Sequence, residues 1–227
     1  MEHKPTAYRA GVALLFSALA SGQNFDLVLK GGHVLDPKNN VDSRLDVGIR
    51  AGRIAAVGPN LTGGKKTLDV SGLYVTPGLV DIHVHVFHTT NVPAAWAGDN
   101  SVAPDSYSFR TGVTTMVDAG SSGYRNFDQF RATVIDRVKT RVLAWLNIAG
   151  YGMMTNLVEQ DTSDMLAAKA AETARRHKAV IVGFKTAHYE RPDWTSVDRA
   201  LDAGKLTSLP IMVDLDSFAP SGLTLNW

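Results

Sequence analysis

The spacing of apolar positions divides the chain into two parts that meet at Pro77. Between Phe25 and Val75, short apolar segments alternate with turn-forming pairs such as Gly31-Gly32 and Gly63-Gly64. Short segments separated in this way are typical of strands joined by tight turns. We expect strands at residues 25–30, 33–35, 45–49, 53–57, 67–70 and 73–75, which together form a small antiparallel β unit.

After Pro77, strand-like segments alternate with segments of helical period. Apolar runs predict five strands, at residues 79–86, 113–117, 141–148, 179–184 and 209–213. Helices are expected over residues 127–138, from Ser163 as a candidate N-cap to His177, and from Thr195 or Ser196 onward. Strands that alternate with helices form βαβ units around a parallel sheet, so this part is of the α/β class.

The strand that follows Pro77-Gly78 carries two histidines in an apolar frame, and we expect it to be buried. His83 and His85 are two residues apart, so their side chains share one face, roughly 6.5 Å apart along the backbone. Two imidazoles placed in this way can bind one metal ion. Hydrogen-bonded core or surface histidines are the alternative, but the Pro-Gly entry, Asp81 and the apolar frame favour metal.

A lysine, Lys185, closes the apolar strand at residues 179–184. An ammonium group at the end of such a strand is poorly solvated, which favours a neutral and nucleophilic amine. A neutral amine can add carbon dioxide and become an anionic carbamate. The alternative is a lysine whose stem packs on the strand while its charged end reaches solvent.

The segment Pro77-Gly78-Leu79-Val80-Asp81-Ile82-His83-Val84-His85 resembles the first-strand motif of the amidohydrolase superfamily, metal-dependent hydrolases built on a TIM barrel. Within that superfamily the chain is most similar to the dihydroorotase-like amidohydrolase/deacetylase group. The similarity extends over roughly residues 25–214, and includes residues 112–120 and Gly183-Phe184-Lys185.

This resemblance implies a partial TIM (β/α) barrel of about five of eight strands, preceded by part of a β-sandwich. It implies that His83 and His85 bind metal, and that Lys185 is the carboxylated lysine that bridges two divalent ions and takes part in catalysis. Zinc is the expected metal, binuclear in the intact family fold, and other divalent metals remain open. A small-molecule amide or acyl compound is the expected substrate.

The chain departs from the family pattern after the fifth strand. Asp214 stands where the family has a histidine; a carboxylate can ligate zinc, so Asp214 is either a substitute ligand or inert. A complete barrel takes about 250 residues by itself, and the family's sixth-strand histidine and eighth-strand aspartate have no counterparts here. We therefore expect a C-terminally truncated homologue.

Polar residues on two loops are further candidates. His188 and Tyr189 follow Lys185 on a loop that is expected to face the pocket, where they can hold a substrate carboxylate or hydroxyl group. Exposed loop polarity explains them equally well. His88, on the long connection 87–110, is assigned no metal role by the resemblance.

Composition narrows the functional classes. A net charge of +1 gives no reason to invoke nucleic acid or an anionic membrane surface. The absence of cysteine excludes disulfides and thiol catalysis. The unfinished sheet edge leaves association into a homo-oligomer open.

The N-terminus predicts export. Lys4 and Arg9 precede an apolar run that ends at Ala18-Leu19-Ala20, a small-x-small cleavage pattern. We expect residues 1–20 to be a signal peptide of a periplasmic or secreted protein, or an uncleaved extension of a cytoplasmic one. Residues 21–76 then form the β unit and residues 77–227 the incomplete hydrolase barrel.

Two hypotheses about function follow. The first is a metal-dependent amidohydrolase that cleaves carbon–nitrogen (amide or acyl, deacetylase-like) bonds with a metal-activated water. The second is a truncated, catalytically inactive fragment that at most binds metal.

Overall fold

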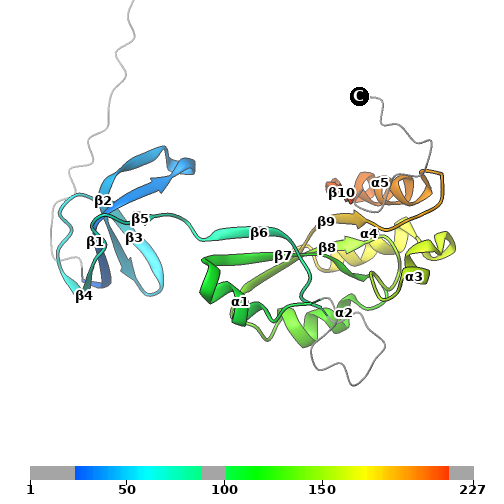
Figure 1. Ribbon diagram of the computed structural model, residues 1–227, viewed down its shortest axis with the longest axis horizontal. Helices are drawn as coiled ribbons and strands as arrows, with labels where there is room; N and C mark the ends of the chain where they lie inside the picture. Colours follow the sequence, from blue (N-terminus) through cyan, green and yellow to red (C-terminus); the bar gives the residue numbers. More distant parts are fainter. Residues whose placement is uncertain (1–23, 88–100, 215–227) are drawn as a thin grey trace, which may run out of the picture. The chain divides into compact units, whose positions relative to one another are not determined.

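The computed structural model describes residues 24–87 and 101–214, and these form two compact units that divide between Pro77 and Gly78 (Figure 1). The predicted signal peptide at residues 1–20 and the candidate His88 lie outside the described residues. Within the described ranges, no helix is long and apolar enough to cross a membrane.

The first unit is a five-stranded sheet. Its strands are β1 (Phe25–Asp36), β2 (Val41–Arg50), β3 (Arg53–Gly58), β4 (Gly64–Asp69) and β5 (Tyr74–Val75), with the short 3-10 helix η1 (Pro37–Asn39) between β1 and β2. Strands β1 to β3 pair antiparallel, as predicted. Strands β4 and β5 instead pair parallel with β1, so the complete sheet is mixed.

Two strands predicted separately in this unit form one. The segments at residues 25–30 and 33–35 belong to β1, whose pairing with β2 shifts register between Leu29 and Gly32. Gly31 lies in this shift with a φ of +75°, a conformation that glycine adopts without strain. The glycine pair therefore bends the strand and does not end it.

The second unit is a parallel sheet of five strands in the order β10-β9-β8-β7-β6 (Figure 1). The strands are β6 (Leu79–Val84), β7 (Val113–Gly123), β8 (Arg141–Asn147), β9 (Ile181–Thr186) and β10 (Ile211–Val213). Sequential neighbours that all run parallel are the arrangement found in a (β/α) barrel. The predicted α/β class and the five strands are confirmed.

Helical segments connect these strands. They are α1 (Pro104–Thr111), α2 (Phe127–Phe130) continuing into the π-helical turn η2 (Arg131–Ile135), α3 (Asn156–Gln160), the 3-10 helix η3 (Thr162–Asp164), α4 (Ala167–Arg176) and α5 (Thr195–Thr207). Their apolar faces and the strands share one core, in which α4 and α5 contribute mostly alanines. Small side chains let these helices pack closely.

Two local predictions are wrong. Strand β6 was expected to be buried, yet Leu79, Val80 and Ile82 are 56%, 57% and 58% exposed. Within the described residues β6 pairs only with β7, so it is an edge strand that a neighbour covers on one side alone. Ser163 does not cap α4, because Asp161 holds its backbone amide and hydroxyl group in η3, and the helix begins four residues later.

The aromatic cluster beneath the sheet gives a direct test of this core. Phe130 is fully buried and lies 4.8 Å from the ring centre of Phe87 and 5.8 Å from that of Phe127. Phe130→Ala is expected to lower the free energy of unfolding by about 3–5 kcal/mol, because it leaves a cavity among these rings. Urea unfolding measures the loss.

Leu157→Ala is the matched control, because that side chain is 81% exposed. It should change the free energy of unfolding by less than about 0.5 kcal/mol. Equal effects of the two substitutions would contradict the packing described here.

Candidate metal centre

Four predicted site residues come from the carboxyl ends of three strands. His83 lies on β6 with His85 just after it, Lys185 lies near the end of β9, and Asp214 follows β10 directly. The strands are parallel, so their carboxyl ends meet at one edge of the sheet, where active sites of α/β barrels are built. Two strands separate β6 from β9, which would place them about 14 Å apart in a flat sheet.

Three of these side chains nevertheless meet. The Lys185 Nζ lies 3.2 Å from the His83 Nε2 and 3.0 Å from the Asp214 Oδ2, and the last two atoms are 3.4 Å apart. Contact across two intervening strands requires the sheet to curl, as the wall of a barrel does. The structure thus brings together residues that are 102 positions apart in sequence.

Lys185 occupies the centre of this cluster and is completely buried. Its ammonium group donates to the His83 Nε2, so that nitrogen presents a lone pair toward the cluster. Its charge is paired with the Asp214 carboxylate, whose side chain is only 16% exposed. Lone pairs of His83 and Asp214 therefore converge on a position occupied by a cation.

Gly120 makes room for the stem of this lysine. A Cβ atom at Gly120 would lie 3.1 Å from the Lys185 Cδ and 3.2 Å from its Cβ, closer than ordinary packing allows. Gly120 also has a φ of +91°, which a residue with a side chain rarely adopts. Glycine at this position therefore lets the backbone of β7 lie directly against Lys185.

His85 lies beside this cluster, with its ring centre 5.9 Å from that of His83. Its Nδ1 is 2.9 Å from the Oγ of Ser121, near the carboxyl end of β7. Burial, and then the positive charge of Lys185, lower the pKa of His85 to about 4. The imidazole is consequently neutral at neutral pH, which is the form that ligates metal.

A buried carboxylate supports the same region. Asp118, on β7, is fully buried and accepts hydrogen bonds from the amides of Val86 (2.9 Å) and Ser121 (2.8 Å). Burial raises the pKa of Asp118 to about 6, although these hydrogen bonds oppose the rise. The Asp118 side chain ties the segment after β6 to the carboxyl end of β7.

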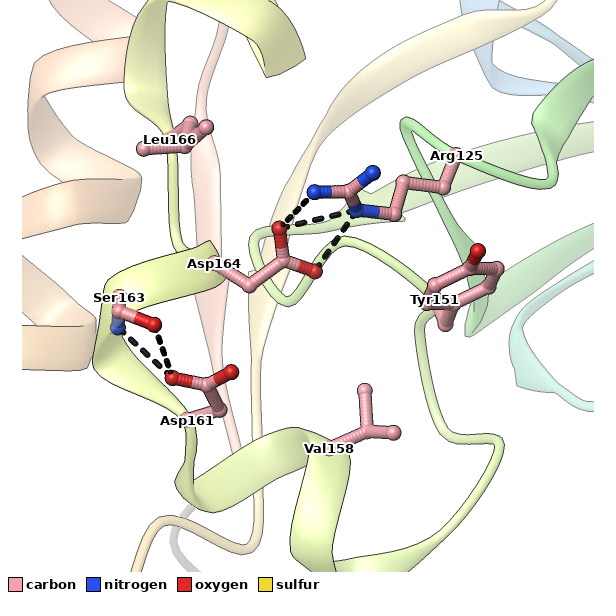
Figure 2. A pocket seen from close by; sticks show the side chains of 7 residues that line it. All are labelled: Arg125, Tyr151, Val158, Asp161, Ser163, Asp164 and Leu166. Atoms are coloured by element: carbon pink, nitrogen blue, oxygen red, sulfur yellow. Dashed lines mark hydrogen bonds and ion pairs between the residues drawn. The ribbon is translucent and has the colours of Figure 1, made fainter.

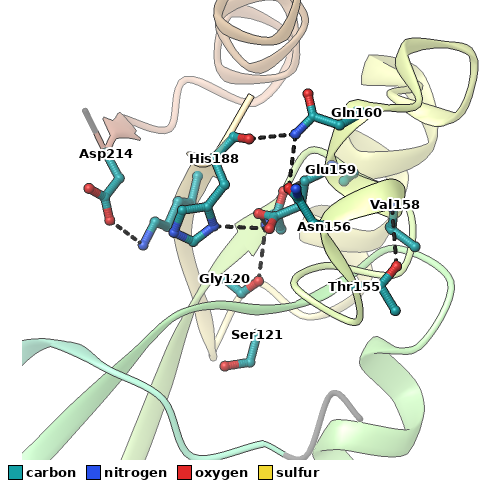
Figure 3. A network of polar contacts seen from close by, with 12 residues as sticks. Gly120, Ser121, Thr155, Asn156, Val158, Glu159, Gln160, His188 and Asp214 are labelled. Carbon is teal, nitrogen blue, oxygen red and sulfur yellow. Dashed lines mark hydrogen bonds and ion pairs between the residues drawn. The ribbon is translucent and has the colours of Figure 1, made fainter. Parts of the chain in front are cut away.

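A second histidine–carboxylate pair adjoins the cluster (Figure 3). The His188 Nδ1 lies 2.9 Å from the Oε2 of Glu159, whose Oε1 accepts from Asn147 at 3.3 Å. Gln160 donates to the His188 carbonyl oxygen, so α3 holds both the ring and the backbone of His188. The hydrogen bond with Glu159 raises the pKa of His188, although burial opposes this.

The two residues expected to bind substrate differ in placement. The His188 side chain is 33% exposed and adopts a φ of +53°, an unusual value for a residue other than glycine. Tyr189 is buried in the hydrophobic core, and its hydroxyl group donates to Asp193 at 2.9 Å. Of the two, His188 is the one partly open to solvent.

The donor set fits a metal ion only with the participation of Lys185. Among the residues that the structure describes, no three His, Cys, Asp or Glu side chains lie close enough to hold an ion by themselves. His83, His85 and Asp214 offer nitrogen and oxygen donors of the kinds zinc accepts. A charged Lys185 would repel the ion, whereas a carbamate at the same Nζ would supply anionic oxygens.

Sequence reasoning missed the residues that orient these side chains. Asp118 and Ser121 lie in the polar end of β7, beyond the strand expected at residues 113–117, and nothing in the sequence links Ser121 to His85. Glu159 gave no signal, because its partner His188 lies 29 positions away on another connection.

A separate cavity of about 360 Å³ lies on the loops after β7 and β8 (Figure 2). It is lined by Arg125, Tyr151, Val158, Asp161, Ser163, Asp164 and Leu166. Arg125 is held by Asp164 through contacts of 2.7–3.0 Å, with its guanidinium 5.6 Å from the centre of the Tyr151 ring. The charges of Arg125 and Asp164 in this cavity therefore pair with each other, and none of the predicted site residues lines the cavity.

Comparison with known proteins places most of the second unit in one family of hydrolases. Residues 74–205 match the amidohydrolase family. A deacetylase of Agrobacterium fabrum is 34% identical over 171 residues, which are 71% of this chain and 40% of the deacetylase. The chain thus spans less than half the length of this curated relative.

Two solved structures share the fold. The match with the crystal structure of a dihydroorotase, at 28% sequence identity, covers 82% of this chain and 50% of the dihydroorotase chain, with a TM-score of 0.71. The match with the crystal structure of an adenine deaminase, at 26% sequence identity, covers 84% of this chain and 50% of the deaminase chain, with the same TM-score. The predicted partial barrel is confirmed, since the five parallel strands form a half-barrel like part of these structures.

The electrostatics of His85 can be measured in the metal-free protein. A ¹⁵N NMR titration should give a His85 pKa near 4, against an ordinary value of 6.5. Because the folded state disfavours the protonated ring, the contribution of His85 to stability is present above pH 6.5 and is lost as the pH falls toward 4.

Lys185→Met is the informative variant, because it removes a positive charge and keeps the bulk of the stem. It should move the His85 pKa part of the way back toward 6.5, since burial remains. A wild-type midpoint at or above 6.5 would contradict the burial and charge described for this ring.

Proposed function

Because the chain belongs to the amidohydrolase family, we propose that it carries a divalent metal centre that hydrolyses a carbon–nitrogen bond of a small acylated or amide substrate. The observation that supports this most strongly is the meeting of His83, Lys185 and Asp214, from β6, β9 and the end of β10, around the buried amine of Lys185. A fully buried lysine amine is costly in a merely structural role.

The residues that would hold the metal are His83, His85, Asp214 and Lys185 as its carbamate, with zinc as the preferred ion. A bound divalent ion at such a site polarises a carbonyl group and lowers the pKa of water. His85 contributes as a neutral imidazole, because burial and Lys185 lower its pKa. Asp214 contributes a carboxylate oxygen in the place where the family has a histidine.

Lys185 would acquire its metal-binding form by a balanced addition. The neutral Nζ attacks the carbon of carbon dioxide, a C–N bond forms, and the amine loses one proton, which Asp214 at 3.0 Å can accept and pass to solvent. The ammonium form must first release a proton to solvent to give this neutral amine, so the overall change from a cation to an anion releases two protons. The converging lone pairs of His83 and Asp214 would then face a metal ion.

The substrate class rests on the relatives. The A. fabrum relative is a deacetylase and a structural neighbour is a dihydroorotase, so N-acyl compounds and cyclic amides are the two candidates. We assign His188 to substrate binding. Its bond to Glu159 raises its pKa, and a protonated ring can donate from Nε2 to a substrate carboxylate or hydroxyl group.

Metal binding without turnover is the second candidate function. The specific observation in its favour is that no three His, Cys, Asp or Glu side chains in the described ranges form a metal site on their own. A weakly held ion would then bind without supporting hydrolysis.

Hydrolysis separates the two candidates. The full chain, purified with zinc and bicarbonate, is expected to hydrolyse N-acetyl amino acids or dihydroorotate, with His83→Ala and Lys185→Met each lowering kcat/KM at least about 10²-fold through weakened metal binding. His33→Gln, in the first unit, should leave the rate unchanged. Zinc bound by the wild type with no turnover of either substrate class would favour the second candidate.

The role of His188 predicts a different kinetic pattern. His188→Gln should raise KM by roughly 10-fold and change kcat less, because a hydrogen bond to a charged group contributes about 1.5–3 kcal/mol to binding. Zinc content should stay at the wild-type level. An unchanged KM, measured with an N-acetyl amino acid, would contradict the assignment of His188 to substrate binding.

A further inference from the structure

The carboxyl end of β7 is connected to the end of β6 by a series of buried polar groups. Asp118 pairs in register with Val84 of β6, and its carboxylate accepts from the Val86 amide at 2.9 Å and from the Ser121 amide at 2.8 Å. Val86 directly follows His85. The carboxylate of Asp118 therefore fixes the backbone on both sides of the contact between His85 and Ser121.

The carboxylate of Asp118 sets the direction of the hydrogen bonds in this series. The Ser121 amide donates to the Asp118 carboxylate at 2.8 Å, and the hydroxyl group of the same residue lowers the pKa of Asp118 by hydrogen bonding to it; an ionised carboxylate can only accept. The serine must therefore donate its single proton to Asp118. Its oxygen, 2.9 Å from the His85 Nδ1, is left to accept, so the ring proton of His85 lies on Nδ1.

The position of this proton decides which nitrogen can bind a metal. A neutral imidazole carries one N–H and one lone pair. With Nδ1 protonated, the lone pair of His85 lies on Nε2. His83 has the same arrangement, because its Nε2 accepts from Lys185. Histidines that bind metal usually donate their other N–H to a partner outside the site, which fixes the orientation of the ring.

The end of β7, residues 120–123, is closely packed at both of its glycines. A Cβ atom at Gly120 would lie 3.1 Å from the Lys185 Cδ, and one at Gly123 would lie 1.9 Å from the carbonyl oxygen of Ala149. Ser121 itself is only 1% exposed. The backbone at Ser121 is thus held in place, and this fixes the position from which the short serine side chain reaches His85.

We propose that Asp118 and Ser121 are positioning residues for His85, and that they fix its Nδ1–H tautomer so that Nε2 is the metal-binding nitrogen. The metal part of this inference rests on the proposed function; the tautomer does not. The two residues touch neither substrate nor metal, and they act through the orientation and the proton of one ring.

The tautomer can be measured directly in the full, metal-free chain. Long-range ¹H–¹⁵N NMR of ¹⁵N-histidine protein at pH 7.5 should show the Nδ1–H form for His85, assigned by comparison with His85→Gln. Ser121→Ala should shift the ring toward the Nε2–H form or a mixture. Ser121→Thr keeps a hydroxyl group and should retain the wild-type form.

Ser122→Ala is the matched control. Ser122 is the next residue of β7 and is fully buried, but its Oγ has no hydrogen-bond partner within the described residues. Its removal should leave the His85 tautomer unchanged. It should also lower zinc affinity by less than about threefold, against the 10- to 100-fold loss expected for Ser121→Ala in a zinc competition titration.

The outcomes separate this inference from the proposed function. An Nδ1–H tautomer that Ser121→Ala removes and Ser121→Thr keeps supports the positioning role, even in a protein that hydrolyses nothing. A wild-type Nε2–H tautomer overturns it. Equal tautomers and equal zinc affinities in the Ser121→Ala and Ser122→Ala variants overturn it as well.

Discussion

The contact between a buried lysine and two residues from other strands is the interaction on which the rest of the second unit depends. Lys185 is completely buried, and its charge is balanced by Asp214 at 3.0 Å while it donates to His83 at 3.2 Å. An isolated ammonium in this position would cost several kcal/mol. Because β10 already pairs with β9, the sheet must curl far enough to bring the end of β6 to these two strands, which is the curvature that a barrel wall needs.

The connections at the carboxyl edge of the sheet serve this contact in different ways. The end of β7 places Gly120 against the lysine stem and Ser121 against His85. The segment after β8 forms α3, whose Glu159 and Gln160 hold His188. The end of one strand and one connection therefore fix the orientation of the central residues, at the edge where α/β barrels build their active sites. The placement of His188 at a positive φ is consistent with a functional constraint on that loop.

The central residues could be predicted because their positions follow from regular structure. Two-residue periodicity puts His83 and His85 on one face, and parallel strands bring Lys185 and Asp214 to the same edge. The partners that orient them could not be predicted in this way. Glu159 reaches His188 only through tertiary folding, and Asp118 of β7 meets Val86 from the segment after β6. The burial of β6 was overestimated because apolar composition does not reveal whether a strand has neighbours on both sides.

Zinc binding by the full chain, with and without bicarbonate, tests the central claim most directly. If Lys185 acts as a carbamate beside His83 and Asp214, bicarbonate should increase the zinc affinity of the wild type and have no effect on Lys185→Met. Zinc binding that is equal in the two proteins, or indifferent to bicarbonate in both, would contradict a metal centre built around this lysine.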